Sequence, residues 1–461
     1  MTVSCLQCVY GSYVLKQRYV LCFMVFLGIV NDYCLRNCLN IAITEMVKPQ
    51  PPKKGTATEC PSKSQAVAIQ SEGFEWTAQE VAWILASFFP GYVVTHIPGG
   101  FLADAYGGKH VVGLGVLTSA IISLATPFAI EIGGVGLLCV LRFLIGFVQG
   151  ALFPAVTTLL ARWVPKKERS RLGSLVMTGP QIGSILCNMI SGMIISSTGN
   201  WKLVFYFWAI VALVWFFLYI ILCYSEPSQH PNITPEEKEE LLLELGVAVK
   251  NKIPWFNLVC YKPTIALMAG QGGHGIVFFF IVINLPKYFK DVLKFNIKEN
   301  GILSSLPYAA LWISGVGAAW VGDWLINTDR LRVVTIRKLY TTIASVFPSI
   351  FVLLAGYFGC DRDMAAIMFI LAMLFKGPFY PGLRVNPLDI TKNFAGILSA
   401  FVNGFGSLVY YPVPYIIAWV AKENLLYQWM YIFWGIFAVS SVTNIIYLAW
   451  ASADRAEWDE V

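Results

Sequence analysis

The sequence predicts an all-α membrane protein with twelve transmembrane helices in two six-helix halves. Of its 461 residues, 57% are hydrophobic and only 13% are charged, whereas soluble domains average about 25% charged residues. Apolar segments long enough to cross a bilayer follow one another along the chain, and short motifs recur at equivalent places in its two halves. Lipid is therefore the expected main solvent, and the halves are expected to be structural repeats.

A transmembrane helix needs about 20 mostly apolar residues. Twelve segments meet this length, at approximately 19–45, 79–103, 110–130, 134–160, 172–196, 202–223, 263–288, 300–325, 335–358, 364–388, 394–420 and 427–450. The seventh segment holds four glycines between positions 270 and 275. These glycines predict a bent helix that lines a central pathway.

The segments between the spans define the expected domain organisation. Thr234 is a candidate N-cap for a short surface helix in the linker, because Pro235 and Glu236 follow it in the first turn. The expected parts are a cytosolic N-terminus (1–18), an amino-terminal half (19–224) with an extracytosolic loop (46–78), a cytosolic linker with a short helix (225–262), a carboxy-terminal half (263–450) and a cytosolic C-terminus (451–461).

Basic residues set the expected orientation, because short cytosolic loops carry an excess of Lys and Arg. Five basic residues lie between 162 and 171, after the fourth span, and four lie between 330 and 338, after the eighth. Both loops would lie on the side of the two termini, which we therefore expect in the cytosol. The 46–78 loop also carries lysines, but its length reduces its weight.

The repeat signal comes from matching positions in the two halves. Asp104 follows the second span and Asp323 follows the eighth. Further along, three residues of the amino-terminal half recur at one constant spacing in the carboxy-terminal half: Lys167, Ser174 and Gly179 match Lys392, Ser399 and Gly404. Such matches favour two parallel repeats.

Several function classes find no support in the sequence. It has no P-loop, no HExxH motif and no Ser/His/Asp pattern, so neither direct use of ATP nor enzyme chemistry is indicated. No metal site and no resident cofactor are expected. Nucleic-acid binding is not expected either, because the basic residues lie in short loops between apolar runs. Of the 11 cysteines, Cys60 and Cys360 both fall in predicted extracytosolic loops, where they either form a disulfide or stay free.

The stretch G-F-L-A-D-A-Y-G-G-K at 100–109 resembles the cytosolic signature of the major facilitator superfamily. A closer likeness to the anion/cation symporter family runs through nearly the whole chain. That family includes sialin, the vesicular glutamate transporters and the type I sodium/phosphate cotransporters. Within it, this sequence most resembles the insect-type putative inorganic phosphate cotransporters. The motifs that carry this likeness lie at 87–92, 97–100, 162–165, 168–171, 285–288, 304–308, 337–338 and 385–390.

This resemblance implies a major-facilitator fold and secondary active transport of a small anion by alternating access. Inorganic phosphate or an organic anion would be the substrate, driven by sodium, a proton or the membrane potential. A monomer in the plasma membrane or in a vesicular or lysosomal membrane is expected. Two alternatives stay open at this point: an uncoupled facilitative anion carrier, and a transporter-derived receptor or scaffold that moves nothing.

Charged residues inside spans are the first candidates for the site, because burying a charge in a bilayer is costly. The resemblance places Arg36 at a substrate-site arginine and His274 where the glutamate transporters have a second arginine. A guanidinium suits an anion because its planar fork matches two oxygens. The alternative for Arg36 is a structural pair with Asp32, four residues away on one helix face. The alternative for His274 is a hydrogen bond to a neighbouring helix.

Four further residues are weaker substrate-site candidates. Arg142 matches a family arginine and either binds substrate or bonds one helix to another. Arg384 stands where the family commonly has Asn, so it either contacts substrate or snorkels to the cytosol. Tyr92 and Asn403 lie on otherwise apolar helices and either line the cavity or bridge helices.

Coupling is where the sequence departs from the family pattern. Ile145 and Gln149 occupy positions at which relatives such as sialin carry carboxylates, and neither side chain can titrate. Asp32 and His96 are unusual for the family and are the candidates for proton coupling. Asp32 is also a candidate oxygen ligand for a coupling sodium ion.

The resemblance also predicts a cytosolic gate, in which Asp104 bonds with basic loop residues while the halves are closed on that side. The alternative is simple loop structure together with orientation charge. The candidate gate residues are Asp104, Lys109, Arg162, Arg169, Arg171, Asp323 and Arg337.

Overall fold

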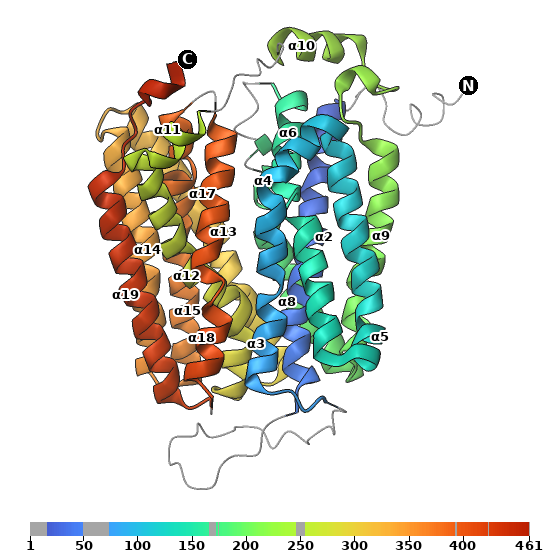
Figure 1. Ribbon diagram of the computed structural model, residues 1–461, viewed down its shortest axis with the longest axis vertical. Helices are drawn as coiled ribbons and strands as arrows, with labels where there is room; N and C mark the ends of the chain where they lie inside the picture. Colours follow the sequence, from blue (N-terminus) through green and yellow to red (C-terminus); the bar gives the residue numbers. More distant parts are fainter. Residues whose placement is uncertain are drawn as a thin grey trace.

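The computed structural model describes residues 16–48, 73–165, 172–173, 175–245, 254–391, 394–422 and 424–460. In this part of the chain nearly all regular structure is helical, with one isolated bridge between Val47 and Phe74. Figure 1 shows two groups of long helices standing side by side, one from each half of the sequence, with α10 lying across one end.

Helices of the amino-terminal half surround α2, which carries Arg36. They are α2 (Gln17–Met46), α3 (Ala78–Ala86), α4 (Phe88–Tyr106), α5 (Gly108–Gln149), α6 (Leu152–Trp163), α8 (Gly179–Thr198) and α9 (Lys202–Leu222). Short helices follow in the linker, namely η1 (Pro227–Gln229), α10 (Pro235–Leu245) and α11 (Trp255–Cys260).

Helices of the carboxy-terminal half include two spans that are divided into shorter pieces. They are α12 (Lys262–Asp291), α13 (Ile297–Asn327), α14 (Val333–Tyr357), α15 (Arg362–Lys376), η2 (Gly377–Phe379), η3 (Tyr380–Arg384), α16 (Asn386–Ile390), α17 (Ala395–Tyr410), α18 (Val413–Val420) and α19 (Leu426–Trp450), before a final turn η4 (Glu457–Glu460).

The helices account for all twelve predicted spans. Within the described residues, eight helical stretches are long and apolar enough to cross a membrane. One of them, Gly108–Trp163, covers the third and fourth spans, because the backbone leaves helical geometry at Gly134 (φ 54°, ψ −139°). The other three spans are α3 with α4, α8 with the residues before it, and α17 with α18. The predicted fold class is confirmed.

The glycines of the seventh span are sites of close helix packing. α12 is an unbroken helix from Lys262 to Asp291. A Cβ at Gly273 would lie 1.9 Å from Thr443 Oγ1, and one at Gly275 would lie 2.3 Å from the Tyr410 ring. The missing side chains let α19 and α17 approach α12 closely, and the predicted bend of this helix stays a prediction.

The tenth span is divided into several pieces. After Lys376 the chain passes through a 3₁₀ turn (η2) and a π-helix (η3) before α16 begins. Pro378 and Pro381 lie in these turns and lack the N–H that a regular helix would use. π-Helical turns are rare and are frequent at functional sites. Arg384 ends this irregular segment.

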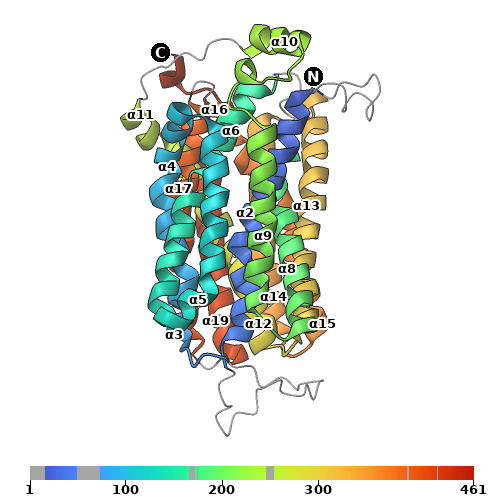
Figure 2. The same ribbon diagram turned by 90° about the vertical axis from the view of Figure 1, so that its right-hand side faces the viewer.

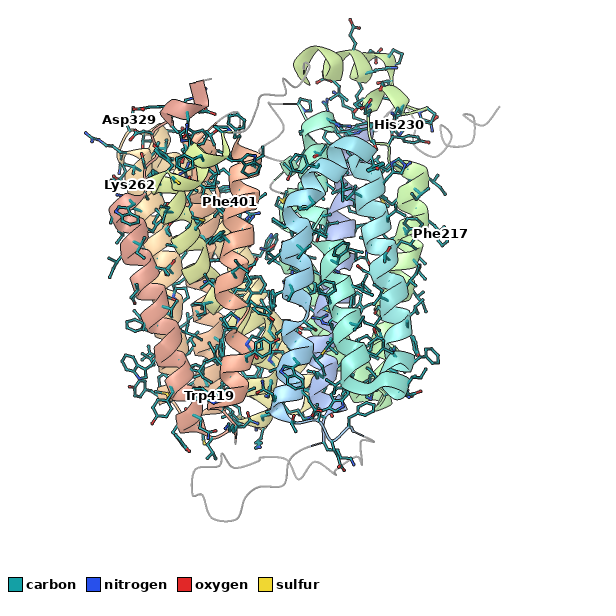
Figure 3. All side chains as sticks on the ribbon, in the orientation of Figure 1. Phe217, His230, Lys262, Asp329, Phe401 and Trp419 are labelled. Atoms are coloured by element: carbon teal, nitrogen blue, oxygen red, sulfur yellow. The ribbon has the colours of Figure 1, made fainter. Side chains whose placement is uncertain are left out.

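The two halves meet away from the linker. We call the end at which α10 lies the linker end; Asp329 and His230 lie there and Trp419 lies at the opposite end (Figure 3). Close to the opposite end, Lys290 of α12 pairs with Glu45 of α2 at 2.9 Å. A Cβ at Gly192 of α8 would lie 2.9 Å from the Gly301 Cα of α13, and these helices run side by side (Figure 2).

No described ion pair joins the halves at the linker end. The pairs found there lie within one half or attach the linker to the amino-terminal half: Lys16–Glu240, Arg18–Glu240, Arg162–Glu226, Arg337–Asp389 and Arg455–Asp459. Within the described residues, the one ion pair that joins the two halves therefore lies at the opposite end.

Candidate anion site between the two halves

Arg36 lies at the centre of an aromatic cluster to which both halves contribute. Its side chain is buried on α2, with the guanidinium carbon 4.1 Å from the ring centre of Phe88. Tyr92 on α4 and Phe279 on α12 lie 5.5 and 5.4 Å away. Aromatic rings attract a guanidinium through their faces but offer no acceptor to its in-plane N–H groups. The guanidinium of Arg36 is thus held in place without any described hydrogen bond from its N–H groups.

The structural pair between Arg36 and Asp32 does not form. Within the described residues, no carboxylate lies within 4.0 Å of the Arg36 guanidinium, and no hydrogen bond from its nitrogens is found. The Asp32 Oδ1 is itself buried without a hydrogen-bond partner. Of the two interpretations of Arg36, the free guanidinium is the one that the geometry favours.

Arg142 holds the backbone of Arg36 rather than facing a ligand. Its Nη1 donates a 3.0 Å hydrogen bond to the Arg36 carbonyl, which ties α5 to α2. Its Nε is sealed in the interior without a partner. Helix-to-helix bonding, one of the two predicted roles, is therefore what Arg142 does in this state.

Tyr92 and His96 extend the aromatic cluster along α4. Tyr92 stacks on Phe88 with ring centres 5.7 Å apart and contacts the His96 ring at 5.0 Å. The His96 Nδ1 lies 3.1 Å from the Gly150 carbonyl. Tyr92 thus belongs to the aromatic cluster around Arg36, whereas His96 is bonded within its own half.

Gln149 stands close to Asp32, the acidic coupling candidate. Its amide nitrogen donates to the Asp32 backbone carbonyl at 3.2 Å and approaches Ser119 Oγ at 3.5 Å. At this family carboxylate position the side chain braces α5 against α2.

Arg384 and Asn403 form a pair that the sequence left separate. The Arg384 Nη1 donates to Asn403 Oδ1 at 2.5 Å, which ties the π-helix to α17. Arg384 is also close enough to Tyr92 and His96 of the other half to act on them electrostatically. It therefore faces the region between the halves, and the predicted alternative of snorkelling is not what the structure shows.

His274 lies deeper in the carboxy-terminal half. Its ring stacks on Phe379 with centres 3.4 Å apart and planes 11° apart. The Nδ1 atom is buried without a hydrogen-bond partner. The predicted bond to a neighbouring helix is thus absent at that nitrogen.

Two further site features escaped sequence reasoning. Lys376 is fully buried, and within the described residues its amine donates a single hydrogen bond, of 3.4 Å, to the Ala344 carbonyl. Gln181 on α8 donates to the hydroxyl of Tyr380 on η3, which links the two halves. A lysine inside the tenth apolar segment was a signal that could have identified the first feature, whereas nothing in the sequence pairs the second.

Three of the gate candidates that the structure describes are engaged locally. Lys109 donates to the Ile220 carbonyl at 2.9 Å, and Arg162 pairs with Glu226 at 3.2 Å. Arg337 pairs with Asp389 at 2.7 Å, while Asp323 shows no ion pair within the described residues. Arg169 and Arg171, with the side chain of Asp104, lie outside the described residues.

Cys360 is disulfide-bonded, but its predicted partner Cys60 lies outside the described residues, so this pairing stays a prediction. The other described cysteines are free thiols: Cys22, Cys34, Cys38, Cys139, Cys187, Cys223 and Cys260. Among the described residues no cluster of three His, Cys, Asp or Glu side chains could hold a metal ion.

Comparison with known proteins places these features in a family context. The family model described as Major Facilitator Superfamily matches residues 21–410. A putative inorganic phosphate cotransporter of Drosophila melanogaster is 33% identical, covering 96% of this chain and 86% of that protein. Human sialin is 32% identical (96% and 90% covered), and human vesicular glutamate transporter 2 is 29% identical (96% and 75%).

Solved structures agree in fold. The crystal structure of a D-xylose-proton symporter superposes with a TM-score of 0.67 at 14% identity, covering 95% of this chain and 98% of that one. An inward-facing, occupied bacterial homolog of the lysosomal transporter Spinster gives 0.66 at 11% identity, with 96% and 97% covered. At such identities the likeness concerns the fold alone.

Proposed function

Because the chain belongs to the Major Facilitator Superfamily, we propose that it carries a small anion across a membrane by alternating access. The observation that carries this proposal is Arg36: a buried guanidinium, fixed by rings from both halves, with no carboxylate beside it in the described structure. A buried cation without a partner is costly unless a bound anion compensates it. Binding an anion there would relieve that cost.

The charge balance around the site supports an anion rather than a cation. Among described residues that are buried away from the linker and the C-terminus, Asp32 is the one acidic side chain, whereas Arg36, Arg142 and Lys376 are basic. Partly buried Arg384 adds a further positive charge from the other half. Fields of one sign in a low-dielectric setting concentrate ions of the opposite sign.

Inorganic phosphate is the leading substrate, because a relative covering nearly the whole chain is named as a putative inorganic phosphate cotransporter. Organic anions such as carboxylates come next, since vesicular glutamate transporters are also similar over the whole chain. Sodium, protons or the membrane potential would supply the energy.

The linker end is proposed to face the cytosol. Arg162, Arg330 and Arg332 lie at helix ends there, as the rule for short cytosolic loops requires. The membrane would be the plasma membrane or a vesicular or lysosomal one. In the opposite conformation the gate residues around Asp104, Asp323 and Arg337 would close the linker end.

The test is uptake of radiolabelled phosphate into proteoliposomes, with sodium and proton gradients imposed separately. Arg36→Ala should abolish uptake, and Arg36→Lys should retain part of it, since an ammonium keeps the charge but loses the fork. Arg332→Ala, at the exposed linker end, is the matched control and should transport normally. Equal uptake by Arg36→Ala would contradict the proposed role, and no uptake by well-folded protein would remove phosphate as the substrate.

A further inference from the structure

Lys376 is an ionisable side chain buried inside the carboxy-terminal half. It ends α15, its exposed fraction is 0%, and its amine makes a single described hydrogen bond, to the Ala344 carbonyl of α14. Within the described residues no carboxylate pairs with it. An ammonium in such a place has no acid to compensate its charge, so gaining or losing a proton there changes the local free energy strongly.

α13 and α14 pack against α15, which ends at Lys376, and η2 follows it. His274 on α12 is the titratable neighbour, and both Lys376 and Arg384 act on it electrostatically. α14 contributes the Ala344 carbonyl, the one described hydrogen-bond partner of the amine. α13 approaches the next residue, Gly377, through Ser314, which cannot titrate near neutral pH. The buried Nδ1 of His274 makes no hydrogen bond, so it can accept a proton in the tautomer in which it carries the lone pair.

The segment that begins at Lys376 leads directly to the anion site. Phe379 stacks on His274, and Tyr380 accepts a hydrogen bond from Gln181 of the other half. Arg384 ends the segment and faces the region between the halves. Because these turns lack the regular hydrogen-bond ladder of an α-helix, a charge appearing at their first residue can shift them without unwinding a long helix.

We propose that Lys376 is the proton-binding site that couples this transporter to a proton gradient, with His274 as the side chain that passes the proton to it. The lone pair of the neutral amine takes the proton and becomes an ammonium, and the ammonium returns the proton on the other side of the membrane. This inference rests on the proposed anion transport. It supplies the titrating group that Ile145 and Gln149 cannot provide.

The experiment compares two modes of phosphate transport in proteoliposomes. Uptake driven by an imposed proton gradient needs the coupling group, whereas counterflow at equal pH on both sides needs only the anion site. Lys376→Met nearly keeps the length of the side chain but cannot bind a proton. In this variant we expect gradient-driven uptake to fall to the level seen without a gradient. Counterflow should continue near the wild-type rate. Lys422→Met, at an exposed position, is the control and should keep both activities.

The result that overturns the proposal is a gradient response in Lys376→Met equal to that of the wild type. A wild-type protein that ignores the proton gradient overturns it too, as does a folded Lys376→Met protein that has lost counterflow. Should Lys376→Met not fold, Asp32→Asn decides: a retained proton response supports Lys376, and a lost response assigns coupling to Asp32. Absence of counterflow in the wild type would contradict anion transport itself. Failure of the proposed function can therefore be told apart from failure of the coupling proposal.

Discussion

Arg36 shows how a single side chain is kept ready for a ligand. The Phe88 ring covers one face of the guanidinium at 4.1 Å, so the group is oriented without consuming any of its N–H donors. Behind it, Arg142 fixes the backbone carbonyl of the same residue. The orientation cost is therefore met before an anion arrives, which is the usual advantage of a preorganised site.

This arrangement predicts that Phe88→Leu weakens anion binding without unfolding the protein. Losing one cation–π contact costs about 0.5–2 kcal/mol, which corresponds to a roughly 2- to 30-fold higher half-saturating phosphate concentration. The measurement is concentration-dependent uptake, with the thermal unfolding midpoint as the check on folding. An unchanged half-saturating concentration would show that the ring does not orient Arg36.

Pairing by sequence spacing failed here for a physical reason. Asp32 and Arg36 are four apart, which brings two side chains onto one helix face. Yet the guanidinium turns to rings from α4 and α12, which the local pattern cannot reveal. The identity of the key residue could be predicted from its charge within an apolar span, whereas its partners required the packing of distant helices.

Helix contacts in the carboxy-terminal half depend on the absence of side chains. The glycines of α12 let α17 and α19 pack against its backbone, and α12 stays helical throughout. Packing of this kind is the main source of cohesion between helices in lipid, where the hydrophobic effect contributes little. The tenth span shows the contrary case, in which prolines break the helix next to Lys376.

Gly275→Val should therefore destabilise the protein. Its Cβ would lie 2.3 Å from the Tyr410 ring, and forcing such a group into a packed interface costs about 1–3 kcal/mol. The thermal unfolding midpoint in detergent should fall clearly. Gly404→Val on α17 is the matched control, because a Cβ there meets nothing within 4 Å. Similar midpoints for the two variants would mean that the close contact contributes nothing.

Across the whole molecule, the contacts between the halves are unevenly distributed. Among described ion pairs, Lys290–Glu45 is the one that joins the halves, and it lies close to the opposite end from the linker. Lys290 also donates to the Thr44 carbonyl, at the end of α2. Both contacts must break before the opposite end can open.

Glu45→Gln should consequently shift the population towards opening at the opposite end. Spin labels at the exposed Ile132 and Tyr357, in different halves, should report a larger share of long distances in this variant. Glu131→Gln is the control, because Glu131 pairs with Lys202 inside one half. A distance distribution identical to that of the wild type would show that the pair does not hold the two halves together.

Some features of the structure could be predicted from the sequence, and others could not. Span length and hydropathy follow from the thickness of a bilayer, so the twelve helices could be predicted. The bond from Gln181 to Tyr380 could not, because it joins positions far apart in two separately folded bundles. The burial of Lys376 likewise depends on the helices packed against α15, namely α13 and α14, rather than on any local pattern.

The close approach of Gly192 to Gly301 has a mechanical consequence. Where two helices touch through their backbones, few side chains have to exchange partners when one rolls over the other; between α8 and α13, the Asn188 side chain, which donates to the Ser304 carbonyl, is one that does. Both glycines lie closer to the opposite end than to the linker end, so a pivot at this contact would give its longer arm to the linker end. A bulky residue at Gly192 or Gly301 should slow the rocking of the halves in both directions and leave anion binding unchanged.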